Sequence, residues 1–88
     1  MKNNLSLKSI NLSKNEIKDG GVIALAEALK SLSLLRNIDL SNNQIGVLGA
    51  RTLVEALKNS TSLRMLDLSG NLMEDESLAE ITEELNLD

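Results

Sequence analysis

Residues 7–17, 35–45 and 63–73 read LKSINLSKNEI, LRNIDLSNNQI and LRMLDLSGNLM. The three stretches align on Asn15, Asn43 and Asn71, which stand 28 residues apart. Each follows the pattern L-x-x-[IL]-x-L-x-x-N-x-[IM], so leucine and isoleucine return at fixed distances from the asparagine. Three copies in one register indicate an internal repeat, in which each unit packs only on its neighbours.

Each copy is expected to contain one strand and one helix. In residues 8–12, 36–40 and 64–68, apolar residues alternate with polar ones, which is the period of a strand with one buried face. The roughly twenty residues between strands predict parallel strands joined by a helical crossover. The residues expected to face the core from the helices recur at helical spacing: Val22, Leu25, Ala26 and Leu29, then Ala50, Leu53, Val54 and Leu57, then Leu78, Ile81, Thr82 and Leu85.

The three stretches, together with Gly21 and Gly49 six residues after the asparagines, resemble the leucine-rich repeat family, in its long ribonuclease-inhibitor-like class. The resemblance covers residues 5–88. It implies an α/β fold, a short right-handed solenoid or horseshoe segment with parallel strands on the concave side and helices on the convex side. We expect one domain, residues 1–88, with repeats at about 7–34, 35–62 and 63–88.

The asparagine column is interpreted as structural. Turns after the strands leave backbone groups without sheet partners, and the amides of Asn15, Asn43 and Asn71 can both donate and accept hydrogen bonds to them. Because only the middle turn has neighbours on both sides, we expect Asn43→Ala to destabilise more than Asn71→Ala. Asp19 and Asp75 are expected to cap the first and third helices.

The family resemblance implies a protein-binding surface on the concave side. Strand alternation places there the side chains of Ser9, Asn11, Asn37, Asp39, Met65 and Asp67, with Arg36 and Arg64 along the edge. Arginine is favoured at binding hot spots and methionine is enriched at interfaces. The rest of this surface is small and polar, which favours a weak or electrostatic contact.

Two neighbouring carboxylates, Asp39 and Asp67, raise the question of acid–base chemistry. We interpret them as part of the repeat pattern L-D-L-S, with Arg36 and Arg64 offsetting their charge nearby. The serine column, Ser13, Ser41 and Ser69, is interpreted as structural too. Because the chain has no His or Cys and no phosphate-binding glycine loop, we expect no enzyme activity, no cofactor and no metal site.

Composition limits the partners. The sequence has no aromatic residue, no basic stripe and no apolar run near the ~20 residues of a membrane helix, so we expect neither nucleic-acid nor membrane binding. Residues 1–7 do not form a signal peptide, so a cytoplasmic location is expected. The partner is expected to be a protein whose identity the sequence does not reveal.

The two ends of the repeat array differ in charge. Residues 1–32 carry five Lys and three acidic residues, whereas residues 61–88 carry one Arg and eight acidic residues. The acidic third copy is interpreted either as a polar cap or as a binding surface. The first copy has no comparable cap, so an open strand edge is expected there, and with it a possible homo-oligomer. An alternative function is therefore a structural, self-associating unit that makes contacts through its end surfaces.

Overall fold

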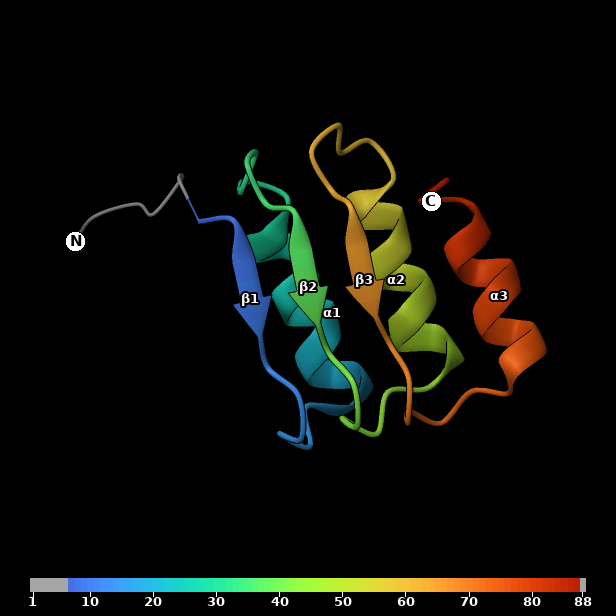
Figure 1. Ribbon diagram of the computed structural model, residues 1–88. Coiled ribbons are helices and arrows are strands. Elements are labelled where there is room, and N and C mark those ends of the chain that lie inside the picture. The colour runs from blue at the N-terminus through green and yellow to red at the C-terminus, as the bar shows by residue number, and fades with distance from the viewer. Residues whose placement is uncertain (1–6, 88) are drawn as a thin grey trace.

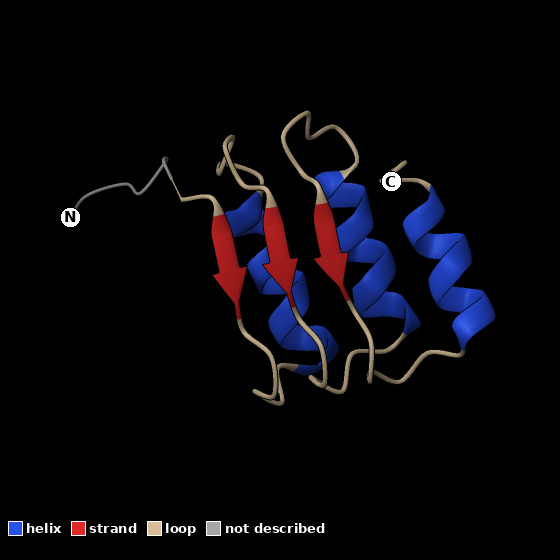
Figure 2. Ribbon diagram, viewed as in Figure 1, coloured by secondary structure: helices blue, strands red, loops and turns tan. Residues whose placement is uncertain are grey.

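The computed structural model describes residues 7–87, which form a row of three strands with three helices behind it (Figures 1 and 2). The strands pair in parallel in the order β1-β2-β3, and the predicted strand–turn–helix solenoid is confirmed. No helix in this part of the chain is long and apolar enough to span a membrane. The elements are β1 (Ser9–Asn11), α1 (Lys18–Leu29), β2 (Asn37–Asp39), α2 (Val47–Leu57), β3 (Met65–Asp67) and α3 (Asp75–Glu83).

The core lies between the sheet and the helices and is most complete in the middle repeat. Ile38, Leu40 and Leu53 are 0% exposed, and every residue predicted to face the core from a helix is buried or partly buried. Burying a large aliphatic side chain contributes about 1.5–3 kcal/mol. Leu, Ile, Val and Ala fill this core because the chain has no aromatic ring to place there.

The residue before each repeat asparagine has a left-handed backbone. The φ angles are 61° at Lys14, 58° at Asn42 and 71° at Gly70. A Cβ on Gly70 would collide with the side-chain oxygen of Asn42, so a larger residue there would have to displace that side chain and adopt a left-handed backbone. The turn is therefore the same in all three repeats, but only the third has the residue that suits it best.

The prediction that Asp19 and Asp75 cap their own helices is wrong. Asp19 lies in the first turn of α1, behind a helical N-cap residue, Ile17, and its Oδ1 accepts a hydrogen bond at 2.7 Å from the N–H of Gly46 in the next repeat. Asp75 is the first residue of α3, and the N-cap Glu74 makes no side-chain cap bond. Asp19 thus joins two repeats, a role that its position in one helix does not reveal.

The helices pack unequally. Gly49 is buried where α2 crosses α1, and a Cβ there would meet the Asp19 side chain and lie 2.8 Å from Val22 Cγ1. In α3 the same position holds Ser77, and Ile81 is the fully buried residue of that helix. The missing glycine therefore coincides with a third helix that is less deeply packed than the second.

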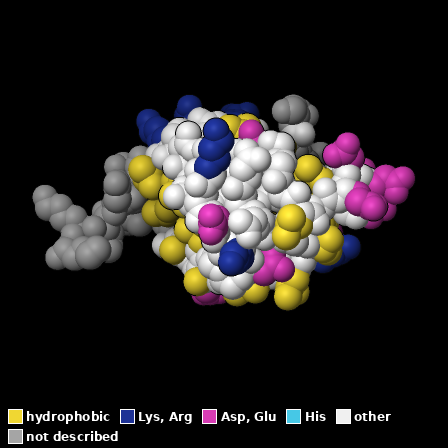
Figure 3. Space-filling view, turned by 90° about the horizontal axis from the view of Figure 1, so that it is seen from below, with side chains coloured by type: hydrophobic (Ala, Val, Ile, Leu, Met, Phe, Trp, Pro, Cys, Tyr) yellow, Lys and Arg dark blue, Asp and Glu magenta, His cyan; other side chains and the backbone are white. Residues whose placement is uncertain are grey.

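The acidic third repeat, interpreted from the sequence either as a polar cap or as a binding surface, leaves a groove at its end of the molecule. Acidic side chains gather at the end of the molecule that α3 forms (Figure 3), and five of the six acidic residues between Glu74 and Glu84 are absent from the lining of the end groove. This groove of about 570 Å³ remains open between β3 and α3. It is lined by Arg64, Met65, Leu66, Asp67, Leu68, Ser69, Leu78, Ala79, Thr82, Glu83, Asn86 and Leu87.

Candidate protein-binding surface

The outward side chains of the three strands form a single face, which we call the concave face: Ser9, Asn11, Asn37, Asp39, Met65 and Asp67. Ser9, Asn37 and Met65 are aligned in one row by the parallel register, and Asn11, Asp39 and Asp67 in a second. Asn37 Nδ2 donates to Ser9 Oγ at 3.2 Å, and the Met65 side chain is 41% exposed. The structure therefore brings together the strand residues predicted from the sequence.

The second row is tied to the serine column. Asp39 Oδ1 accepts hydrogen bonds from the N–H of Ser41 at 3.0 Å and from its hydroxyl at 2.7 Å. Asp67 holds Ser69 in the same way, and Asn11 holds Ser13 with an amide oxygen instead. Each aspartate thus uses one oxygen to shape the turn, while its second oxygen has no partner within residues 7–87.

The surroundings of Asp67 do not suit acid catalysis. The hydroxyl and the backbone N–H of Ser69 both stabilise the charged carboxylate, and they lower the pKa of Asp67 below its ordinary value of 3.8. A general acid working near neutral pH needs the opposite shift. Within residues 7–87, no group of three or more His, Cys, Asp or Glu side chains is placed to hold a metal ion.

Arg36 and Arg64 do not offset the aspartates as the sequence suggested. Each arginine precedes a three-residue strand and each aspartate ends it, a separation of about 10 Å along the backbone. Among residues 7–87, the ion pairs are Lys30–Glu27 at 2.9 Å and Lys58–Glu55 at 3.2 Å, both on the helices. Both arginines are exposed, so their guanidinium groups remain available at one edge of the concave face.

The asparagine column lies beneath the concave face and joins the turns. Asn43 Oδ1 accepts hydrogen bonds from the N–H groups of Asn15 at 2.8 Å and Ile17 at 3.3 Å. Asn71 Oδ1 makes the same two bonds to the middle repeat, at 2.8 and 2.9 Å. The amides of Asn43 and Asn71 therefore bond to the preceding repeat as well as to their own turn, whereas the Asn15 amide bonds only within its own turn. This ladder agrees with the structural interpretation of the column.

A family model described as Leucine Rich repeat matches residues 3–26, 29–54 and 59–81, which together make up most of the chain. The chain belongs to the leucine-rich repeat family. No curated protein matches its sequence. Leucine-rich repeats are commonly protein-interaction modules and are generally non-catalytic. The ribonuclease-inhibitor-like class stays a prediction.

The sequence interpretation missed an apolar patch at the edge where the strands end. Leu72 is 68% exposed, Leu48 is 64% exposed and Val47 is 41% exposed. Leu72 lies beside the other two, since its N–H donates to Ile45 O at 2.8 Å. The signal was present in the columns, because each of these positions holds a polar residue or glycine in the other two repeats. Figure 3 shows hydrophobic side chains exposed on this side of the molecule.

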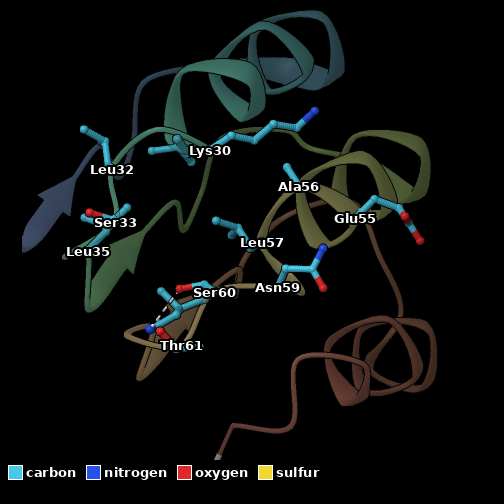
Figure 4. A pocket seen from close by; sticks show the side chains of 12 residues that line it. Lys30, Leu32, Ser33, Leu35, Glu55, Ala56, Leu57, Asn59, Ser60 and Thr61 are labelled. Carbon is cyan, nitrogen blue, oxygen red and sulfur yellow. Dashed lines mark hydrogen bonds between the residues drawn. The ribbon is translucent and has the colours of Figure 1, made fainter. Parts of the chain in front are cut away.

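A second missed feature is a cavity of about 450 Å³ between the loops that follow α1 and α2. Figure 4 shows the charged ends of Lys30 and Glu55 directed away from Leu57, Ser60 and Thr61. Lys30 is already paired with Glu27. The cavity therefore lacks converging charged groups, and we assign no ligand to it.

Proposed function

We propose that this leucine-rich repeat chain is a non-catalytic module that binds a protein partner on its concave face. The observation that carries the proposal is the exposure of Arg36 and Arg64 beside the exposed Met65, with no carboxylate pairing either arginine among residues 7–87. Arginine and methionine are enriched at protein interfaces, where one arginine can donate two parallel hydrogen bonds to a carboxylate. These three side chains supply the anchors.

The charges on the concave face suggest the chemistry of the partner. Arginines stand where the strands begin, and carboxylates stand where they end, about 10 Å away. The unused oxygens of Asp39 and Asp67 accept hydrogen bonds or face a positive charge. A complementary partner segment therefore carries an acidic group over the arginine edge and a basic or N–H donor group over the aspartate edge.

The expected affinity is modest. Met65 is the one large apolar side chain among the six residues of the concave face, and the chain has no Trp or Tyr to act as a hot spot. Exposed charge pairs contribute about 0.2–1 kcal/mol each and are screened by salt. We therefore expect a dissociation constant near or above about 1 μM, which weakens as ionic strength rises.

Site-specific photocrosslinking tests where the partner binds. A photoreactive side chain is placed at Asn37, in the centre of the concave face, and in a separate protein at Leu48, in the apolar patch. Both positions are exposed, so both proteins are expected to fold. The crosslinked protein is identified by mass spectrometry, expressed, and titrated against the chain by calorimetry. We expect efficient crosslinking from position 37 and little from position 48.

Two variants then separate the surfaces quantitatively. Asn37→Arg is expected to weaken binding of the identified partner at least about tenfold, because it crowds and charges the centre of the face. Leu48→Ser leaves the concave face intact and is the control. If Leu48→Ser abolishes binding while Asn37→Arg retains it, the partner binds the apolar patch and the concave-face proposal is wrong.

A further inference from the structure

The asparagine ladder has a direction, and it leaves opposite hydrogen-bonding groups at the two ends of the stack. Asn71 Oδ1 accepts from the N–H groups of Asn43 and Ile45, and Asn43 does the same to the first repeat. Within residues 7–87, Asn15 Oδ1 accepts no hydrogen bond, and the N–H groups of Asn71 and Met73 have no acceptor. One end offers an acceptor, and the other offers the two donors that such an acceptor binds in the middle of the stack.

Apolar surface is exposed at the first-repeat end. Four of its side chains, which are only partly buried, occupy positions that are 0% exposed in the middle repeat. The difference arises because the middle repeat has a neighbour on both sides. The partly buried residues are Ile10, Leu12, Ile17 and Leu25, and their fully buried counterparts are Ile38, Leu40, Ile45 and Leu53.

The groove at the third-repeat end is lined by residues whose equivalents in the first repeat contact the second repeat. Leu78, Ala79 and Thr82 line it, and the residues 56 positions earlier are Val22, Ile23 and Ala26. Val22 lies against Gly49 of α2, while Ile23 and Ala26 face α2 across a shallow gap. The end groove is therefore the unfilled equivalent of the surface on which the second repeat packs.

Gly21, at the first-repeat end, also indicates a surface for a close helix contact. Its counterpart Gly49 is buried and lets α2 approach α1 closely, whereas Gly21 is exposed. A helix interior normally disfavours glycine by about 0.5–1 kcal/mol relative to alanine, so a close helix contact would account for it. In the third repeat, which packs less closely on the second, Ser77 stands at this position.

The charges at the two ends also match. In the chain, Asp19 accepts a hydrogen bond from the N–H of Gly46 in the following repeat. At the third-repeat end the residue equivalent to Asp19 is Asp75, and at the first-repeat end the residue equivalent to Gly46 is Lys18. The Asp75 carboxylate therefore lies where the Lys18 side chain of an incoming copy would arrive, while the Lys18 N–H already donates to Asn43 O at 2.8 Å.

We propose that copies of this chain stack head to tail, with the first repeat of one copy on the third repeat of the next, in the register of the internal repeats. Asn15 of the incoming copy accepts from the N–H groups of Asn71 and Met73. Its apolar end fills the groove beside Leu78, and its Lys18 meets Asp75. The occupant of both end surfaces is a second copy of this chain. The groove shares Arg64, Met65 and Asp67 with the proposed partner-binding surface, so the concave face stays open at Asn37 and Asp39.

Such a contact joins two different surfaces, so it does not close with two copies. Heterologous contacts continue into a ring or an open filament. A symmetric contact between two first-repeat ends would instead place one Asn15 oxygen against another, acceptor against acceptor. The proposal therefore requires a mass that keeps growing beyond the dimer as concentration rises.

Sedimentation velocity on the whole chain tests the proposal, with neighbouring glycines as a matched pair. Gly21→Arg places a long charged side chain on the proposed contact, while Gly20→Arg points into open space, with no atom within 4 Å of the added Cβ. A Cβ at Gly21 would lie 2.6 Å from Ile17 Cγ2, so the β-branched Ile17 side chain has to shift in Gly21→Arg. We expect Gly21→Arg to lower the association constant at least about tenfold and Gly20→Arg to leave it unchanged.

Ala79→Arg tests the contact from the other end, because Ala79 is an exposed residue of the groove lining. Each blocked variant keeps one intact end, so equal amounts of Gly21→Arg and Ala79→Arg should form a heterodimer and stop there. Far-UV circular dichroism checks that each variant is folded, and Ala79→Arg alone serves if Gly21→Arg does not fold. A wild-type chain that stays monomeric at about 1 mM, equal effects of the two glycine variants, or no heterodimer in the mixture would overturn the proposal.

Discussion

Replacing Asn43 by alanine is the sharpest test of how the turns are held together. The side chain is 0% exposed and makes five hydrogen bonds, three from Nδ2 to backbone carbonyls and two from backbone N–H groups to Oδ1. The three carbonyls, of Leu12, Leu40 and Ser41, each keep another donor, namely Asn15 Nδ2, Asn71 Nδ2 and the N–H of Lys14. The two N–H groups, of Asn15 and Ile17, lose their acceptor.

The magnitude follows from those two orphaned donors. A buried polar group without a partner costs about 1–3 kcal/mol, and the missing amide also leaves a small cavity. We therefore expect Asn43→Ala to reduce the free energy of unfolding by about 3 kcal/mol. Asn71→Ala orphans the buried N–H groups of Asn43 and Ile45, but the Asn71 side chain is itself partly exposed, so water can enter the space it leaves, and about 2 kcal/mol is expected.

Asn15→Ala is the matched control. Its amide is exposed and donates only within its own turn, so the expected loss is at most about 1 kcal/mol. For a chain of this size, 1 kcal/mol corresponds to about 4–8 °C in Tm. Asn43→Ala is thus expected to melt about 12–24 °C below the wild type.

Urea unfolding followed by far-UV circular dichroism measures these differences. The chain has no Phe, Tyr or Trp, so protein concentration is set by peptide-bond absorbance, and intrinsic fluorescence offers no second probe. Equal slopes of free energy against urea in the three variants would show that the midpoints can be compared. The ladder argument is refuted if Asn15→Ala is as damaging as Asn43→Ala, or if Asn43→Ala loses less than about 1 kcal/mol.

Three further predictions concern the turns and their charges. Lys14→Gly should raise stability by up to about 1 kcal/mol, because φ is 61° there, and Gly70→Ala should lower it, as thermal melts of both can show. Asp19→Ala should reduce the free energy of urea unfolding by about 1–3 kcal/mol, because the Gly46 N–H loses a charged acceptor at 2.7 Å. Because the folded pKa of Asp67 is depressed, its stabilisation is present above the ordinary pKa of 3.8 and is lost as pH falls through the folded value, so Asp67→Asn should flatten the loss of Tm below about pH 4.

The register of the repeat could be predicted from the sequence because it depends on local periodicity. Strand alternation placed Asn37 and Met65 on the outer face, and helical spacing placed Leu53 in the core, as the structure has them. The prediction is stronger because the same periodicity recurs in all three copies. Burial differs only where a neighbour is missing, as at Ile10 and Leu66, which are partly exposed in the end repeats.

Interactions between repeats were harder to predict, because they join residues in different columns. Asp19 is a residue type expected at a helix start, but its carboxylate accepts a hydrogen bond from the N–H of Gly46, 27 residues later. Arg36 and Asp39 are close in sequence, yet the extended backbone of β2 places them at opposite ends of the strand. In both cases the backbone conformation between the two residues determines whether they can interact. Residue type alone does not predict that conformation.

The direction of the ladder links stability to assembly. If each asparagine side chain bonded to both neighbouring repeats, the two ends of the stack would expose similar hydrogen-bonding groups. The two ends would then not be complementary. Because the Oδ1 atoms of Asn43 and Asn71 accept only from the preceding repeat, the first repeat ends in the free acceptor of Asn15 and the third in the free donors of Asn71 and Met73 within residues 7–87. The same geometry that makes Asn43 costly to remove therefore gives the stack two complementary ends, and a repeat array built this way can extend by the contact that holds it together.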